Sequence, residues 1–308
     1  MMRIHINHRK QIHREGKRFL QNHGLGRRLA STSSKTPKPN TPPSPSEPSH
    51  VPLKSFVVGT IAGITGSLVG LGGGFLMIPL MTSTSFLSLS QHIAHGTSLF
   101  AVTTTGLAGG LSYGQDGNVD LYSAGAIAVS GIFTARLGAK FSNRLSQKQL
   151  KQALGGFMVL VAPIVPLKPY LMSYKENNVE EDGEGNESKF KIIGISSCIG
   201  LFSGFMAGLL GVGGGAVVVP ALTLFTPMDH YTALGTSLAA MGLPAAVGTL
   251  THFQAGNVHL RVAPFLAMGS LVGAYCGGRI GGKIDENFLR TGFTGMMITL
   301  GLRTFIKA

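Results

Sequence analysis

The feature that most constrains this chain is a stretch of 61 residues, from Ser55 to Gln115, that contains no Asp, Glu, Lys or Arg. Soluble domains average about 25% charged residues, whereas this chain has 13% over its 308 residues. An uncharged run of this length suits the interior of a bilayer, where charged side chains are costly and helices satisfy their own backbone. The sequence therefore predicts an all-α integral membrane protein and disfavours a soluble enzyme.

The net positive charge of the chain does not indicate a nucleic-acid partner. The chain has 26 basic and 13 acidic residues, but residues 1–50 alone hold 10 basic and 2 acidic ones. The excess therefore lies mainly in an N-terminal segment and not on a folded face. The two cysteines, Cys198 and Cys276, each stand in an apolar run, which is typical of packing residues and not of a disulfide or a metal site. We expect no metal, cofactor or nucleic acid to bind.

The first 30 residues have the composition of a targeting segment. They carry eight basic residues against one acid, Glu15, and lack an apolar core. This favours a mitochondrial presequence, and thus the mitochondrial inner membrane, over a secretory signal peptide. The alternative is a basic tail that binds anionic lipid. A proline-rich run over residues 36–52 follows and predicts an extended linker, so we expect residues 1–54 to be disordered.

Eight apolar runs follow the linker, and each is suited to a membrane-spanning segment of about 20 residues. The first and fifth are too long for one straight helix, and each is interrupted by glycines and then by a proline. The acidic segment 168–191 predicts a hydrated loop between a membrane repeat at 55–167 and a second at 192–308. The runs are 55–87, 93–112, 121–139, 150–167, 192–226, 232–251, 262–278 and 291–306.

The two halves of the membrane region repeat the same motifs in the same order. A glycine-rich motif that ends in proline recurs at an offset of 141 residues, and a Gly-Thr-Ser-Leu and a Gly-Asn-Val motif both recur at an offset of 139. This order predicts two homologous four-segment repeats in which the first segment is discontinuous. The paired motifs are 70–79 with 211–220, 96–99 with 235–238, and 117–119 with 256–258.

The direction of the two repeats is suggested by their basic loops. Lys and Arg gather between the third and fourth segments of both halves, at 136–151 and at 279–290. Because such loops tend to face one side of a membrane, they favour repeats that run parallel. If the broken first segment instead turned back on itself, the repeats would be inverted.

The glycine runs are the first candidate binding elements. Three consecutive glycines destabilise a helix and free backbone groups inside the membrane, so each run predicts the start of a half-helix whose N–H groups and dipole face an anion. Close helix packing is the alternative for glycines at four-residue spacing. Residues 211–216 match the pattern G-x-G-x-x-A, but their apolar flanks argue against a dinucleotide site. The candidate substrate-binding glycines are Gly72, Gly73, Gly74, Gly213, Gly214 and Gly215.

Hydroxyl and imidazole side chains are the second candidate elements. Thr97, Ser98, Thr236 and Ser237 follow a glycine in both repeats and are candidates to complete the anion site, unless they bond their own helices. His95 and His252 are candidates for proton coupling, with interfacial histidines of no role as the alternative. No nucleophile and base pair stands out, so we expect no catalytic residues.

The motif pair resembles that of the TauE/SafE sulfite exporter family of membrane transporters. The resemblance rests on 70–79, 95–98, 211–220, 235–237 and the two Gly-Asn-Val motifs, and covers about residues 55–306. It implies about eight membrane segments and transport of a small sulfur-containing anion such as sulfite or an organosulfonate. A membrane scaffold or assembly factor without transport is the main alternative, and a membrane enzyme is a weaker one. Direction, coupling ion and oligomeric state stay open.

Overall fold

The structure is a computed structural model that describes residues 51–84, 86–163, 186–281, 284 and 286–306. The predicted presequence and most of the acidic loop lie outside the described residues. Two helices begin earlier than the sequence suggests, at Val51 and at Asn186. A helix extends readily beyond an apolar run, since its backbone bonds internally, and Pro52 in the first turn removes only an N–H that has no helical partner.

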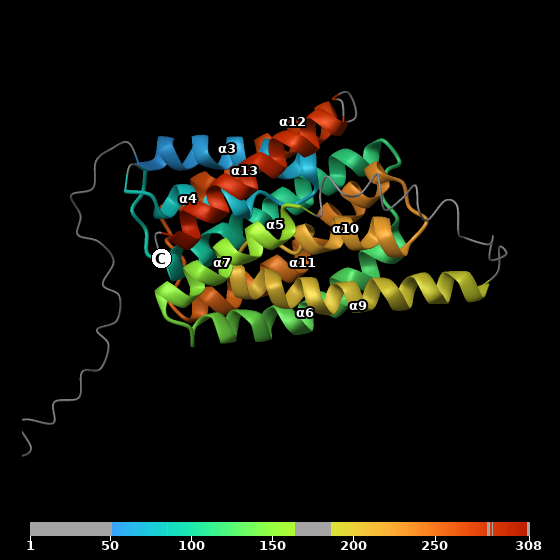
Figure 1. Cartoon of the computed structure of the whole chain (residues 1–308), viewed down its shortest axis with the longest axis horizontal. Coiled ribbons are helices and arrows are strands. Elements are labelled where there is room, and N and C mark those ends of the chain that lie inside the picture. Colours follow the sequence, from blue (N-terminus) through green and yellow to red (C-terminus); the bar gives the residue numbers. More distant parts are fainter. Residues whose placement is uncertain (1–50, 85, 164–185, 282–283, 285, 307–308) are drawn as a thin grey trace, which may run out of the picture. The chain divides into compact units, whose positions relative to one another are not determined.

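Every regular element in the described part of the chain is an α-helix, and the helices follow the predicted apolar runs (Figure 1). The two long runs are each divided, the first into α3 and α4 and the fifth into α9 and α10. The helices are α3 (Val51–Val69), α4 (Gly74–Thr82), α5 (Gln91–Gln115), α6 (Leu121–Ser142), α7 (Gln147–Val161), α9 (Asn186–Leu210), α10 (Gly215–Phe225), α11 (His230–Gln254), α12 (Ala263–Gly281) and α13 (Glu286–Ile306).

Short polar side chains fix where several of the helices begin. Asp120 accepts hydrogen bonds from the first backbone N–H groups of α6, and Asp229 does the same for α11. Ser146 and Gln149 form a reciprocal capping box at the start of α7. Burial alone would raise the pKa of Asp229, but hydrogen bonds from Thr232 and Tyr231 lower it below its ordinary value. The carboxylate is therefore charged at neutral pH and stabilises the N-terminus of α11.

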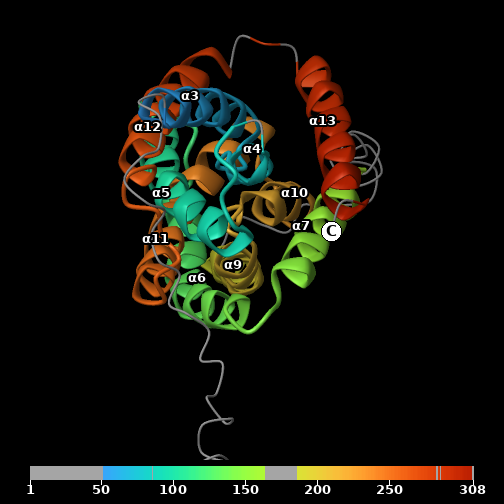
Figure 2. The same cartoon turned by 90° about the vertical axis from the view of Figure 1, so that its left-hand side faces the viewer.

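The helices pack in pairs that join the two halves of the chain. α3 lies along α12, α9 lies along α6, and α5 packs against α11 (Figure 2). Glycines allow close approach: a Cβ built on Gly63 would lie 2.8 Å from the Cα of Ser270. Small residues at such crossings replace the hydrophobic drive that is missing between helices in lipid.

The two halves run in opposite directions, so the parallel arrangement favoured by the basic loops is wrong for this structure. Gly96 near the start of α5 lies against His252 near the end of α11, and Gly110 lies against Ala239 near its start. The reason is that each divided segment turns back. In Figure 1, α3 begins at the left end and α4 returns there, whereas α9 begins at the right and α10 returns to the right.

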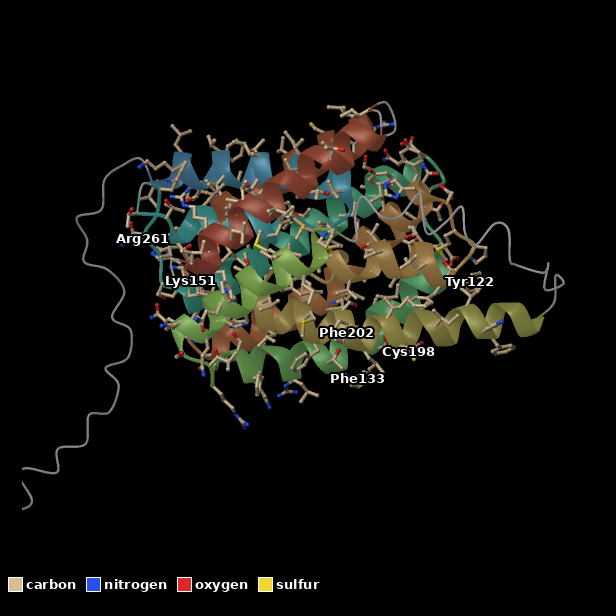
Figure 3. All side chains as sticks on the ribbon, viewed as in Figure 1. Tyr122, Phe133, Lys151, Cys198, Phe202 and Arg261 are labelled. Carbon is tan, nitrogen blue, oxygen red and sulfur yellow. The ribbon has the colours of Figure 1, made fainter. Side chains whose placement is uncertain are left out.

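Charge separates between the two ends of the helices. Lys151 and Arg261 lie at one end, here called the Lys151 end, and Tyr122 lies at the other (Figure 3). The acidic side chains that the structure describes, Asp116, Asp120 and Asp229, belong to the helix ends at the Tyr122 end. At that end Asp116 forms an ion pair of 3.6 Å with Arg279 of α12.

Length and composition identify three of the described helices as candidate membrane spans. They are Val51–Val69, Phe190–Leu210 and His230–Gln254, with a mean hydropathy of 1.3, 1.9 and 1.4. Many large apolar side chains on α6 and α12 face outward, among them Phe133, Leu137 and Met268. An apolar outer face of this kind suits contact with lipid.

Candidate functional site

The two helix breaks lie directly against each other at the centre of the molecule. A Cβ built on Gly74, the first residue of α4, would lie 2.7 Å from the carbonyl oxygen of Gly211. One built on Gly215, the first residue of α10, would lie 2.7 Å from the Cα of Leu71. The glycines at both breaks are buried. The sequence reasoning thus identified two elements that the fold brings together.

Left-handed backbone explains why the breaks are built from glycine. Gly70, Gly72 and Gly73 have φ values of 72°, 78° and 75°, and Gly211 and Gly213 have 70° and 83°. Such values cost an L side chain about 1–2 kcal/mol. Gly214 differs, since it caps α10 with φ of −76°.

Two apolar side chains cover the breaks. A Cβ built on Gly72 would lie 2.6 Å from Met241 Sδ and 3.2 Å from Val102 Cγ1, and one on Gly213 would lie 2.9 Å from Val102 Cγ1. Val102 in α5 and Met241 in α11 are buried. Sequence reasoning missed this Val102–Met241 pair, although both residues stand at the same distance from their Gly-Thr-Ser motifs and a longer repeat alignment would have matched them.

The predicted serines reach across to the opposite break. Ser98 Oγ donates to the carbonyl oxygen of Gly211 at 2.6 Å, and Ser237 Oγ donates to that of Gly70 at 3.0 Å. Ser98 Oγ also lies 2.9 Å from the carbonyl oxygen of His95, three residues earlier in its own helix. Each serine therefore satisfies a buried carbonyl group that the break removes from the helix.

The predicted threonines hold the Gly-Asn-Val turns of the opposite half. The backbone N–H of His259 donates to Thr97 Oγ1 at 3.0 Å, and that of Asp120 donates to Thr236 Oγ1 at 2.9 Å. The carbonyl group of Asn257 also lies against Gly96. Each Gly-Thr-Ser motif thus links one turn and one break of the other half.

The two predicted histidines are buried, so neither is an interfacial histidine in this structure. His95 Nδ1 lies 3.3 Å from the carbonyl oxygen of Leu209, and its Nε2 lies 3.0 Å from Gln91 Nε2. His252 Nε2 lies 3.0 Å from the carbonyl oxygen of Gly208, and its Nδ1 has no hydrogen-bond partner among the described residues. Both rings donate to the last carbonyl groups of α9, which gives neutral imidazoles with one acceptor nitrogen each.

The geometry suits an anion without a buried cation. α4 and α10 both begin at the paired breaks, and their N-cap residues, Gly73 and Gly214, provide no side chain to cap them. The positive ends of two helix dipoles therefore meet in one buried region. In the conformation described, the Val102–Met241 pair occupies the space over the glycines.

Removing either cross-break serine is expected to destabilise the protein. Ser98→Ala or Ser237→Ala leaves a buried carbonyl oxygen without its donor, which costs about 1–3 kcal/mol. Thermal unfolding in detergent should show a clear drop in the midpoint for both variants. Thr105→Val is a matched control, because its hydroxyl bonds Ala101 in its own helix. An equal drop in all three variants would contradict a special role for the serines.

Comparisons with known proteins agree with this arrangement. A family model described as "Sulfite exporter TauE/SafE" matches residues 55–304. The chain is 32% identical to the probable membrane transporter protein YunE of Bacillus subtilis, over 75% of this chain and 87% of the relative. It is 28% identical to a probable membrane transporter protein of Xylella fastidiosa (77% and 87% covered) and 26% identical to MJ0441 of Methanocaldococcus jannaschii (80% and 92% covered). No solved structure matches significantly.

Proposed function

Because the chain belongs to the sulfite exporter TauE/SafE family, we propose that it carries a small sulfur-containing anion, sulfite or an organosulfonate, across a membrane. The family and the relatives named as probable membrane transporters support membrane transport, and the apolar helices support an integral membrane protein. The observation that carries the proposal is the meeting of two uncapped helix N-termini at the paired glycine breaks.

The proposed anion site lies at these breaks, and transport proceeds by alternating access around them. Backbone N–H groups at Gly72–Gly74 and Gly213–Gly215 bind the oxyanion, as helix N-termini do in other anion sites. The hydroxyls of Ser98 and Ser237 are donors to carbonyl groups in this conformation, so their proposed role is to hold the breaks. Thr97 and Thr236 accept hydrogen bonds here, and each keeps its own proton for an anion.

The buried histidines are proposed to couple proton movement to transport. His95 and His252 both contact the end of α9, next to the Gly211 break. A proton taken up by the unpartnered Nδ1 of His252 would place a positive charge close to the anion site. The charge would stabilise a bound anion and leave with it.

The membrane unit is proposed to contain eight segments in two inverted four-segment repeats. Two observations support this: α3 pairs with α12 as α9 pairs with α6, and the serine and threonine bonds occur twice with exchanged halves. Tyr122 and Arg261 are aligned residues 139 positions apart. They lie at opposite ends in Figure 3.

Cysteine labelling tests the inverted repeats. In a variant with Cys198 and Cys276 replaced by serine, Tyr122→Cys and Arg261→Cys should react with a membrane-impermeant maleimide from opposite sides of a sealed vesicle. Parallel repeats would place these two aligned positions on the same side. Labelling of both from one side would therefore contradict the inversion.

The basic N-terminal segment is proposed to direct import into mitochondria, on its composition alone. Residues 1–50 fused to a fluorescent reporter provide the test. A reporter that stays diffuse would reject this location and leave the transport proposal intact.

Flux in proteoliposomes tests the transport proposal itself. The purified chain should move labelled sulfite or a short alkylsulfonate faster than empty vesicles do, and faster than it moves chloride. A membrane scaffold or assembly factor predicts no flux above that of empty vesicles for any anion. A membrane enzyme predicts a chemically altered product, which chromatography of the vesicle contents would detect.

A further inference from the structure

A second polar pocket lies at the Lys151 end and shares no residue with the helix breaks. It has a volume of about 310 Å³ and is bounded by the end of α4 and the segment after it, by α7 and by α13. The family match and the repeat motifs assign nothing to this place.

Two cations from different halves of the chain line the pocket. Lys151 comes from α7 and Arg303 from the last turn of α13. The acidic side chains that the structure describes all lie at the opposite end, so no described carboxylate neutralises this pair there. Lys151 also stands near the N-terminus of α7, where the helix dipole disfavours a positive charge. Capping of α7 therefore does not explain its position.

The remaining wall is partly polar and partly apolar. Thr304 lines the pocket with 8% of its surface exposed, and Ser83 brings a second hydroxyl. Leu80 and Leu300 form an apolar side next to the cations. A ligand that satisfies this wall needs an anionic head with several acceptor oxygens and an attached apolar group.

We infer that this pocket binds an oxyanion joined to an apolar group. Two sources share that chemistry: an anionic phospholipid of the surrounding bilayer, and a soluble organic sulfonate or phosphate. Basic pockets between membrane helices favour the first source. The inference does not depend on which anion the protein transports, so its failure leaves the proposed function standing, and the reverse also holds.

Ligand binding to the purified full chain in neutral detergent tests the inference. The probes are dioctanoyl phosphatidylglycerol, dioctanoyl phosphatidylcholine, hexanesulfonate and sodium sulfate, titrated by calorimetry. Phosphatidylglycerol or hexanesulfonate should bind, phosphatidylcholine should not, and sulfate should bind at least about tenfold more weakly than the better ligand. The double variant Lys151→Gln/Arg303→Gln should lower affinity at least about tenfold, because hydrogen bonds to charged groups are strong.

The matched control removes two charges from the same end without touching the pocket. Arg144 and Lys148 are exposed at the Lys151 end and do not line the pocket, so Arg144→Gln/Lys148→Gln should change affinity less than twofold. Binding of phosphatidylglycerol alone identifies a lipid site, and binding of hexanesulfonate alone identifies a soluble ligand. Absence of binding by both, or an equal loss in control and pocket variants, overturns the inference.

Two further results keep the test decisive. If the double variant does not fold, Lys151→Gln alone takes its place, and unchanged affinity for the better ligand then overturns the inference. Equal affinity for sulfate and hexanesulfonate would overturn the apolar part of the ligand.

Discussion

Alanine at Gly74 or at Gly215 is expected to eliminate most transport while the chain still inserts into the membrane. Neither glycine has a left-handed backbone, so the effect is steric. The new Cβ of Gly74→Ala would lie 2.7 Å from backbone atoms of Gly211 and Val212, and that of Gly215→Ala would press on Gly70 and Leu71. Backbone atoms yield only if the two breaks separate. An overpacking cost of about 3 kcal/mol corresponds to a roughly 100-fold loss of flux.

Gly125 supplies the control for this experiment. It lies inside α6, and a Cβ built there meets nothing within 4 Å. Gly125→Ala should therefore transport normally and gain up to about 1 kcal/mol of helix stability. Initial rates in proteoliposomes, normalised to inserted protein, compare the three variants. Normal flux in Gly74→Ala and Gly215→Ala would show that the contact between the breaks is not needed for transport.

The sequence treats the central glycines of the two runs as equivalent, and the structure separates them. Gly73 combines a left-handed φ with a position against the carbonyl group of Ala62. Gly214 has an ordinary φ and faces the side chain of Ser203, 2.9 Å from a built Cβ. Valine at Gly73 therefore threatens folding itself, whereas valine at Gly214 strains one side-chain contact. The aligned motifs alone contain no sign of this difference.

The apolar runs, the two breaks and the repeated motifs could be predicted because each depends on local sequence. The direction of the repeats could not be read correctly from the basic loops. Arg279 is paired with Asp116 at its own end of the molecule, so it is a weaker signal of membrane side than an unpaired arginine. The loop at 136–151 has no described carboxylate at its end, and it alone keeps the expected asymmetry.

The roles of the hydroxyls were also beyond the sequence. Ser98 and Gly211 are 113 residues apart, and their hydrogen bond exists only because α5 packs against the opposite break. A Gly-Thr-Ser motif indicates available hydroxyls but not their partners. The structure adds that one hydroxyl of each motif serves a break and the other serves a turn.

Shortening the Val102–Met241 pair is expected to raise transport and widen the range of anions carried. Both side chains lie over the glycines at the breaks, so an anion reaches the N–H groups only after they move. Met241→Ala removes packing worth about 2–5 kcal/mol in a buried site. If opening limits the rate and the open conformation lacks this packing, the maximal flux of Met241→Ala/Val102→Ala should rise at least about tenfold. Alkylsulfonates with longer chains should gain more than sulfite does.

Met158→Ala separates this effect from general loosening of the protein. Met158 is fully buried in α7 and does not touch the breaks, so the variant loses the same side-chain atoms elsewhere. It should lower the unfolding temperature by a similar amount and leave the maximal flux and the preference among anions unchanged. Higher flux in Met158→Ala as well would attribute the gain to lost stability, and unchanged flux in the double variant would mean that other side chains close the site. A gain confined to the double variant would identify Val102 and Met241 as the barrier that each anion must displace.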